Sequence, residues 1–350
     1  MTSTRRQLVL AAVALTTGLT AQAAQKVCVY DMLGASGDNF NMLRDYVVAM
    51  QRHGVTIDLK AYNNEGVAAE DFRTGQCDAV VGTAFRTRQF NAVTAATDSL
   101  GATTIVRDGK IDMAASYDVL RKLIQTYAAP SPQVTKLMVN GDYEVGGIGP
   151  IGAAYPIVND RRINTVEALA GKRIASFDYD KAQAVMIQRI GAQPVSADVT
   201  NFALKFNNGQ LDMIAAPSIA YKPLELYKGI GSKGAIARFP IMILTYQMIL
   251  NRTKFPEGFG EKSRAYWLTQ FDRNLQQIRM ADASIPASTW MDLSAENSYK
   301  YTLMLRESRI DIAEKGLYDK RGLKVIKKIR CAVNPGDPEC STKSEEEWKK

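Results

Sequence analysis

Hydrophobic and polar positions in the first part of the chain divide it into short apolar runs and longer amphipathic stretches. Apolar residues dominate 26–30 and 77–82 and alternate with polar ones over 56–62, so these three segments predict strands. Between them, residues 40–52 and 67–74 place apolar side chains at a helical period. Strands that alternate with helices at this spacing indicate a parallel sheet with helices on its faces.

The segment from 165 to 217 repeats this alternation. It predicts three strands and two helices, in the order strand 172–177, helix 181–190, strand 193–195, helix 202–208 and strand 211–215. A second parallel sheet follows from the same rule. The predicted fold class is therefore α/β, with two doubly wound α/β lobes.

Two long segments link the lobes: a glycine-rich crossing over 134–157 and an apolar, β-like run over 239–250 that could cross back. Residues 147–152 formally match the dinucleotide-binding pattern G-x-G-x-x-G, but Pro150 interrupts the loop and no helix follows. We interpret this segment as a crossing in which Gly146, Gly147 and Gly149 permit rotation at a hinge. The predicted organisation is a signal peptide over 1–23, a first lobe over 24–150 completed by about 241–280, a second lobe over 151–240, C-terminal helices over about 281–340 that pack across, and a flexible tail over 341–350.

The first residues have the pattern of a secretory signal peptide. Arg5 and Arg6 precede an apolar run over 8–19, and Ala21-Gln22-Ala23 supplies a small-x-small cleavage site. The two arginines fit an ordinary signal as well as a twin-arginine one, so the Sec and Tat routes both stay open. No later segment offers about 20 consecutive apolar residues, so we expect a periplasmic protein without a membrane span in the mature chain.

Composition adds little to this picture. Apolar residues make up 46% of the chain, which supports a sizeable core, and the formal net charge is +8. Much of the positive excess lies in residues 320–330. Basic runs can mark nucleic-acid binding. In an exported protein we favour a solvated helix face instead, and we expect no nucleic-acid partner.

Four cysteines in an oxidising compartment favour disulfides, and three connectivities are possible. Cys331 and Cys340 flank a turn-rich octapeptide that closes easily. Cys28 and Cys77 each lie at the start of a predicted strand, and those strands would be neighbours in the sheet. We predict these two pairs. Neither has the spacing of a metal site, so no metal is expected.

Ligand contacts are expected just past the strand ends, where α/β sheets bind ligands. Phe177 can pack on an apolar or cationic ligand face, while Asp178 or Arg86 would decide the sign of charge accepted. Alternatively, Asp178 or Asp180 merely caps the helix that begins near 181. The contacts expected from position are Ser36, Asp38, Asn39, Asn63, Glu65, Thr83, Phe85, Arg86, Phe177, Asp178 and, within the returning strand, Tyr246.

Enzyme motifs are missing from the sequence. The one histidine, His53, ends an amphipathic helix, and no H-E-x-x-H, G-x-S-x-G or P-loop pattern occurs. We therefore expect no catalytic residues and no cofactor, and we favour a binding protein. The alternative is an efflux-associated or structural periplasmic accessory protein. A periplasmic hydrolase, with catalytic groups far apart in the sequence, is a weaker alternative.

Residues 166–217 resemble the solute receptors of tripartite ATP-independent periplasmic (TRAP) transporters. The resemblance rests on Leu169–Ile174, Gly191–Pro194 and Asn208–Pro217, and it touches the first lobe through Gly75–Gly82. It implies a type II periplasmic-binding-protein fold with two lobes and a hinge. It also implies a receptor that captures a small-molecule solute and delivers it to a membrane permease. We expect such a receptor to be a monomer.

The sequence departs from that family at two ligand positions. The family's carboxylate-clamping arginine aligns with Ile174, and Arg173 would point to the other face of the strand. The asparagine before the last proline is Ala216 here. With the acidic and aromatic groups of 178–180 nearby, these changes suit a neutral or cationic solute. The resemblance also adds Tyr155 to the expected contacts, because the family places a second ligand residue there.

Overall fold

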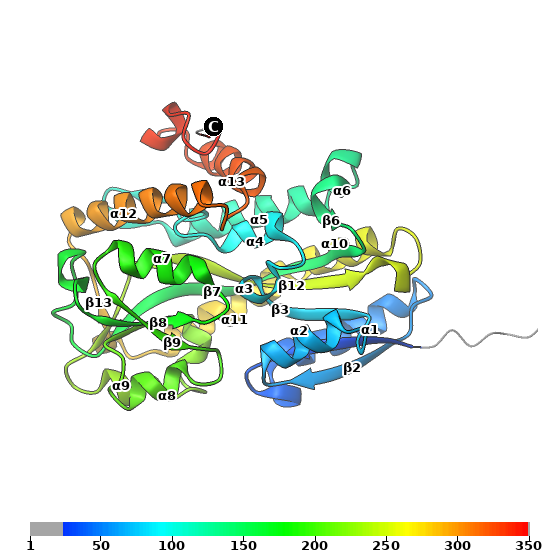
Figure 1. Cartoon of the computed structure of the whole chain (residues 1–350), viewed down its shortest axis with the longest axis horizontal. Coiled ribbons are helices and arrows are strands. Elements are labelled where there is room, and N and C mark those ends of the chain that lie inside the picture. The colour runs from blue at the N-terminus through cyan, green and yellow to red at the C-terminus, as the bar shows by residue number, and fades with distance from the viewer. Residues whose placement is uncertain (1–23, 349–350) are drawn as a thin grey trace, which may run out of the picture.

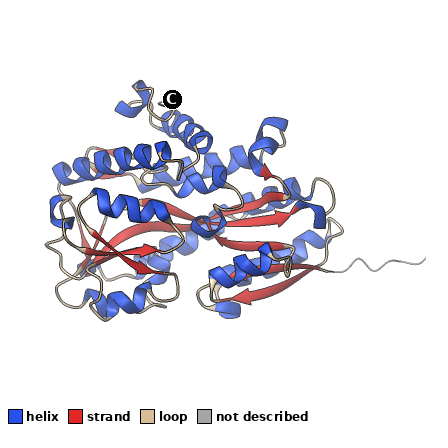
Figure 2. Ribbon diagram, in the orientation of Figure 1, coloured by secondary structure: helices blue, strands red, loops and turns tan. Residues whose placement is uncertain are grey.

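Two α/β lobes share one central sheet in the computed structural model, which describes residues 24–348 (Figure 1). Helices lie on both faces of this sheet, as the alternating pattern of the sequence predicts (Figure 2). The α/β fold class is therefore confirmed. The expected signal peptide over 1–23 lies outside the described residues.

Each lobe is built on three parallel strands. The parallel strands are β1 (Gln25–Tyr30), β2 (Ile57–Tyr62) and β3 (Ala79–Thr83) in the first lobe, and β8 (Arg173–Phe177), β9 (Gln193–Ala197) and β10 (Met213–Ala216) in the second. In each trio the first strand of the chain lies in the middle, with β1 between β2 and β3 and β8 between β9 and β10.

Two long antiparallel strands, β7 (Tyr143–Val158) and β12 (Met242–Asn251), run through both lobes and join them. In the first lobe β12 pairs with β3, and in the second lobe β7 pairs with β10. The order of the main sheet is thus β2-β1-β3-β12-β7-β10-β8-β9. Three short strands join this sheet, β6 (Val139–Asn140), β11 (Ala235–Ala237) and β13 (Trp290–Met291), and a separate ribbon pairs β4 (Val106–Arg107) with β5 (Lys110–Ile111).

The helices of the first lobe and its flank precede β7 in the chain, and those of the second lobe follow it. The early helices are α1 (Asp38–Gln51), α2 (Glu65–Arg73), α3 (Ala84–Thr87), α4 (Ala92–Ala95), α5 (Met113–Ala128) and α6 (Pro132–Met138). The helices of the second lobe are α7 (Lys181–Arg189), α8 (Phe202–Asn207) and α9 (Tyr227–Ile230).

Four further helices follow β12. They are α10 (Phe259–Thr269), α11 (Phe271–Ser284), α12 (Ala295–Glu314) and α13 (Lys320–Val333). Helix α10 packs on β7 and α5, and α12 packs on α7 in the second lobe. Helix α13 returns to pack on α4 and α5 beside the first lobe, so the C-terminal helices connect the two halves (Figure 1).

The glycines of β7 serve close packing. A Cβ on Gly147 would overlap the indole of Trp267, and one on Gly146 would overlap Leu250. Gly152, by contrast, has a φ of +134°, which L side chains rarely adopt. It faces Leu244 of β12, where the register shifts by one residue before Thr245. A second register shift lies after Met248, which pairs with Gly147, while Ile249 pairs with Val145 and Gly146 is skipped. The crossing is therefore irregular at two points, at Gly152 and at the glycines 146 and 147 that the sequence suggested for the hinge.

Both predicted disulfides are confirmed. Cys28 lies within β1 and Cys77 just before β3, and their Cα atoms are 5.9 Å apart. Because β1 and β3 are neighbouring parallel strands, the two cysteines lie beside each other. The Cα atoms of Cys331 and Cys340 are 5.6 Å apart across the turn after α13.

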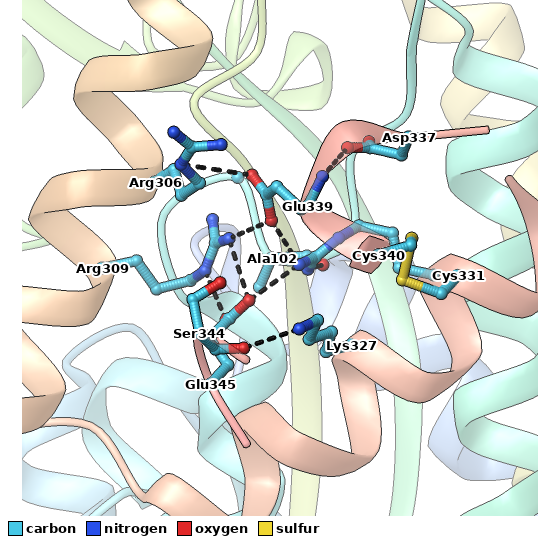
Figure 3. Close-up of polar contacts among 12 residues, drawn as sticks. Ala102, Arg306, Arg309, Lys327, Cys331, Asp337, Glu339, Cys340, Ser344 and Glu345 are labelled. Atoms are coloured by element: carbon cyan, nitrogen blue, oxygen red, sulfur yellow. Dashed lines mark hydrogen bonds and ion pairs between the residues drawn. A yellow bond between two sulfur atoms is a disulfide. The ribbon is translucent and has the colours of Figure 1, made fainter. Parts of the chain in front are cut away.

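A buried ion cluster anchors the C-terminal segment (Figure 3). Arg309 of α12 and Arg330 of α13 both contact the carboxylates of Glu339 and Glu345, at 2.6–3.3 Å. Their guanidinium groups also donate to the carbonyls of Leu100 and Ala102. All four charged side chains of the cluster are at least nine-tenths buried. The cluster thus ties α12, α13 and the C-terminal segment to the loop before β4.

A flexible tail was expected over 341–350, of which the structure describes 341–348, and this part is held against the rest of the protein. Glu345 is 1% exposed, and Lys327 donates to the carbonyls of Thr342 and Ser344. The charged composition of the tail suggested solvation, but its charges find partners that are distant in sequence. Lys327 and Arg330 are both buried, so only part of the basic run 320–330 forms the solvated helix face that we expected.

Candidate ligand-binding cleft

The strand ends of the two lobes face each other across the lobe boundary. On the first lobe, β3 ends at Thr83 and leads directly into α3. On the second, β8 ends at Phe177 and leads into α7, whose N-cap is Asp180. Because parallel strands present their carboxyl ends at one edge, these loops bring side chains of both lobes together.

Glu65 is a buried carboxylate at this edge. Its Oε1 accepts hydrogen bonds from the backbone N–H of Thr83 (2.7 Å) and from the Thr83 hydroxyl (2.6 Å). Its Oε2 accepts from the hydroxyl of Tyr179 on the other lobe, at 3.4 Å. Burial raises the pKa of Glu65 to about 7, against the lowering effect of the Thr83 hydrogen bonds. Glu65 can therefore titrate near neutral pH.

Residues 85–88 of the first lobe contact residues 177–180 of the second. The Phe85 and Phe177 rings meet edge to face, 6.0 Å between centroids. The Arg86 guanidinium lies 3.5 Å from the centroid of the Tyr179 ring, within cation–π distance. These contacts, with that between Glu65 and Tyr179, hold the lobes in a closed arrangement.

The contacting loops line an open hollow of about 340 Å³, which we call the α7-side cavity. Its lining is Phe85, Arg86, Arg88, Gln89, Tyr179, Asp180, Lys181, Ala182 and Leu317. Arg88 and Asp180 form an ion pair within it, with Nη1 2.8 Å from Oδ1. The first lobe thus contributes a positive charge to this cavity, and the second lobe contributes a negative one.

A second cavity, of about 110 Å³, opens at the lobe boundary beside α1; we call it the α1-side cavity. Its polar lining residues are Asp31, Asp38, Asn39, Asn274 and Gln277, and its apolar wall includes Tyr246, Trp267 and Ile219. Among the described residues, the buried atoms Asn39 Oδ1 and Trp267 Nε1 find no hydrogen-bond partner. Both atoms are buried and are not exposed to solvent in this cavity.

Asp31 shapes the α1-side cavity. Its carboxylate accepts from the backbone N–H groups of Leu33, Asn39 and Phe40, which fixes the loop after β1 at the start of α1. Burial nevertheless raises the pKa of Asp31 above its ordinary value, because desolvation outweighs these hydrogen bonds. The cavity has two acidic side chains and no lysine or arginine in its lining.

The structure gathers most of the expected contacts. Asp38, Asn39 and Tyr246 line the α1-side cavity, and Phe85 and Arg86 line the α7-side one. Glu65, Thr83 and Phe177 lie between these cavities, in the contacts described above.

The remaining four expected contacts lie elsewhere. Ser36, Asn63 and Asp178 are exposed and line neither cavity. Tyr155 packs edge to face on Trp290, 5.0 Å between centroids, in a separate hollow beside Asp282. Tyr155 lies within β7, where it pairs with Ala216 of β10. Its side chain is therefore part of the hydrophobic core of the second lobe.

Several residues of the cleft were not among the expected contacts: Asp31, Arg88, Tyr179, Asp180 and Trp267. Asp180 caps α7, as the alternative interpretation of the sequence predicted, because it accepts a hydrogen bond from the backbone N–H of Ala182 at 3.1 Å. It also pairs with Arg88. Asp31 follows β1 directly and Tyr179 lies two residues after β8, so the strand-end rule that selected their neighbours applies to them equally. Trp267 comes from a helix, which that rule does not reach.

The arginine clamp of the resembled family has no counterpart at β8. Arg173 pairs with Asp212, Nη2 2.7 Å from Oδ1, and lowers the pKa of that carboxyl to about 2. Ile174 points the opposite way and is buried. Within residues 24–348 there is no group of three or more His, Cys, Asp or Glu side chains placed to hold a metal, and no helix long and apolar enough to cross a membrane.

Comparison with known proteins places the chain among binding proteins. The sequence profile of the family described as "Solute-binding protein AdeT 1/2" matches residues 48–345. The "Probable solute-binding protein AdeT1" of Acinetobacter baumannii is 41% identical over 317 residues, covering 91% of this chain and 100% of that protein. The "Probable solute-binding protein AdeT2" of the same organism is 28% identical over 209 residues, covering 60% of this chain and 88% of that protein. The curated names in this group describe binding proteins, not enzymes.

Solved structures show the same fold at low sequence identity. A TRAP periplasmic solute-binding protein from Desulfovibrio salexigens with bound orotic acid superposes with a TM-score of 0.69 at 13% identity, covering 89% of this chain and 99% of that one. The periplasmic ectoine-binding protein of the TeaABC TRAP transporter from Halomonas elongata gives 0.66 at 13% identity, covering 89% and 100%. The fold expected from the resemblance is thereby confirmed.

Proposed function

Because the chain belongs to the solute-binding protein family AdeT 1/2, we propose that it is a periplasmic receptor that captures a small solute between its lobes. The closed form then presents the solute to a membrane permease. Export by the signal peptide would place the receptor in the periplasm. The chain supplies binding groups and no catalytic step.

The observation that carries this proposal is the contact between strand-end loops of opposite lobes. Glu65 and Arg86 of the first lobe both contact Tyr179 of the second, and Phe85 contacts Phe177. Each contact joins one lobe to the other, so opening of the cleft would break it, and a cavity lies on either side of these contacts. A solute that binds side chains of both lobes in these cavities would favour the closed form.

The lobes can move because only a few segments connect them. β7 and β12 cross the boundary, and the crossing is irregular at Gly152 and at the register shift after Leu244. Hinge closure in two-lobed proteins uses a few residues that absorb changes in φ and ψ. We place the hinge of this receptor at that point.

The experiment that tests the function is identification of a bound solute. The native protein would be isolated from the periplasm, denatured, and its released small molecules identified by mass spectrometry. We expect one compound at near stoichiometric amount in wild type, and its loss in Tyr179→Ala, which removes the contacts with Glu65 and Arg86. Tyr299→Ala is the matched control, because Tyr299 is 63% exposed.

The solute can be lost during purification, so the same protein is also screened by thermal shift against a metabolite library. A bound solute, whether co-purified or found in the screen, that raises the melting temperature of wild type and the control but not of Tyr179→Ala supports the receptor. If nothing co-purifies and no compound raises the melting temperature, the proposed function is wrong.

A further inference from the structure

Glu65 is a buried carboxylate with hydrogen-bond partners in both lobes. It begins α2 of the first lobe and is 1% exposed. Within its own lobe, the backbone N–H and the hydroxyl of Thr83 both donate to Oε1, at 2.7 and 2.6 Å. From the other lobe, the hydroxyl of Tyr179 lies 3.4 Å from Oε2. The partners of Oε1 are therefore in the first lobe, whereas the partner of Oε2 is in the second.

This carboxylate is buried without a hydrogen-bonded cation. Among the described residues, its donors are one backbone amide and two hydroxyl groups. The charge of Arg86 acts on Glu65, but that guanidinium lies against the Tyr179 ring, 3.5 Å from its centroid. Asp180, the next residue in the chain, is paired with Arg88. Burial of a carboxylate in such surroundings favours its uncharged form, and it raises the pKa of Glu65 to about 7.

The other titratable neighbours do not offset the cost of a charge at this place. Burial raises the pKa of Tyr30 and Tyr246, and the charge of the carboxylate raises it further, so both tyrosines are uncharged at neutral pH. Asp31 acts on the same two tyrosines, and Asp198 of the second lobe acts on Tyr30. Apart from Arg86, the groups around this carboxylate are therefore neutral or acidic.

Opening of the cleft would separate Tyr179 from Glu65 and let water reach Oε2. Thr83 would stay in place, because it belongs to the same lobe as Glu65. A solvated glutamate, with an ordinary pKa of 4.5, is charged at neutral pH. In the closed form Oε1 already accepts two hydrogen bonds, so a proton would lie on Oε2 and be donated towards the hydroxyl oxygen of Tyr179.

We propose that lobe closure takes up one proton at Glu65, so that acidic conditions favour the closed form and alkaline conditions favour the open form. This inference rests on the proposed function, because it concerns the same closure of the two lobes. Between pH 4.5 and about 7, the closed form holds a proton that the open form releases. The resulting stabilisation of the closed form is complete below pH 4.5 and is lost as the pH rises through about 7. The ratio of closed to open form falls by at most about 300-fold over this range, because each pKa unit is a tenfold change in an equilibrium constant.

Small-angle scattering of the mature chain, stripped of solute, tests this inference at pH 5.5 and pH 8.5. We expect wild type to have a larger radius of gyration at pH 8.5. Glu65→Gln should keep the smaller radius at both pH values, because glutamine is uncharged, its oxygen can accept from Thr83 and its amide can donate towards Tyr179. Circular dichroism and melting temperature at both pH values confirm that each variant folds.

Asp98→Asn is the matched control. Asp98 is also buried, and burial raises its pKa to about 7 as well. Both of its oxygens accept from Thr245 of β12, and none of its hydrogen bonds reaches the second lobe. Asp98→Asn should therefore keep the wild-type change in the radius of gyration. Equal radii of wild type at the two pH values would overturn the proposal, and so would a folded Glu65→Gln variant that keeps the wild-type change.

The outcome also separates this inference from the proposed function. A radius of gyration that falls on addition of the co-purified solute, but does not change with pH, refutes the proton uptake at Glu65 and leaves the receptor standing. A radius that depends on pH in wild type and not in Glu65→Gln supports proton-coupled closure, whether or not a solute has been identified.

Discussion

Arg88 of the first lobe and Asp180 of the second form an ion pair across the lobe boundary, with Nη1 2.8 Å from Oδ1. Their side chains are 16% and 1% exposed, so opening of the cleft would return both charges to water. Residues 92 positions apart in the chain thus meet at the point where closure is completed. In the proposed receptor, the pair would link ligand binding to lobe closure.

Truncation of this pair should weaken solute binding. Arg88→Met leaves Asp180 buried without its partner in the closed form, and the loss of such a partner costs about 2–5 kcal/mol of affinity. Calorimetry with the identified solute measures the effect. Arg52→Met, on an exposed arginine of the same lobe, is the control and should bind as wild type does. Equal affinities of the two variants for the solute would contradict a role of the ion pair in solute binding.

Glu65 should make stability fall as the pH rises. Burial raises its pKa from 4.5 to about 7, so the native state holds a proton that the unfolded state releases above pH 4.5. Its contribution is fully present below pH 4.5 and is lost as the pH rises through about 7. At about 1.4 kcal/mol per pKa unit, the loss is about 3 kcal/mol.

Asp98 behaves in the same way and must be separated from Glu65. Burial raises the pKa of Asp98 to about 7, and its carboxylate accepts two hydrogen bonds from Thr245. Urea unfolding at pH 5 and pH 8 would be compared for wild type, Glu65→Gln and Asp98→Asn. Each variant should show a smaller difference between the two pH values than wild type. A Glu65→Gln variant with the full wild-type difference would contradict the assignment.

The two disulfides should differ in their contribution to stability. Loss of the Cys331–Cys340 bond, in the double serine variant, should lower the free energy of unfolding by about 2–3 kcal/mol, because it closes a short loop with a sequence separation of 9. The Cys28–Cys77 bond has a separation of 49, so its loss should cost about 4 kcal/mol in the same picture. Peptide mapping under non-reducing conditions checks both bonds. Free thiols at all four positions in the exported protein would contradict them.

The buried ion cluster gives a sharper stability prediction. Glu345→Ala leaves Arg309 and Arg330 with less than their full set of partners inside the protein, which should cost about 3–5 kcal/mol. Glu347→Ala is the matched control two residues away, because the Glu347 side chain is 65% exposed and should change stability by less than about 0.5 kcal/mol. Chemical unfolding of wild type and both variants measures these changes in the free energy of unfolding. Similar small effects would mean that the C-terminal segment is not anchored as described.

Local pattern predicted the elements well because each strand and helix carries its own period. The strand expected over 172–177 is β8 (Arg173–Phe177), and the helix expected over 181–190 is α7 (Lys181–Arg189). The edge where ligand residues gather also follows from strand direction, which is how Glu65, Phe85 and Arg86 were found.

Pairings between distant residues could not be predicted in this way. Glu345 lies in a charged tail, and its burial depends on Arg309, 36 residues earlier. Likewise, both Asp178 and Asp180 follow the end of a strand, but Asp178 is exposed and Asp180 is buried. The difference depends on Arg88 of the other lobe, which pairs with Asp180 and cannot be predicted from strand-end position. Tyr155 was placed by resemblance, and here it packs within its own lobe against Trp290.

Small-angle scattering of the mature chain tests the central claim most directly. The protein would be stripped of solute by mild denaturation and refolding, and its radius of gyration measured without and with the co-purified solute at saturation. If the lobes close on the solute, the radius of gyration falls on addition, and Arg88→Met shows a smaller fall at the same concentration. An unchanged radius of gyration at saturation would contradict a receptor that closes about a hinge.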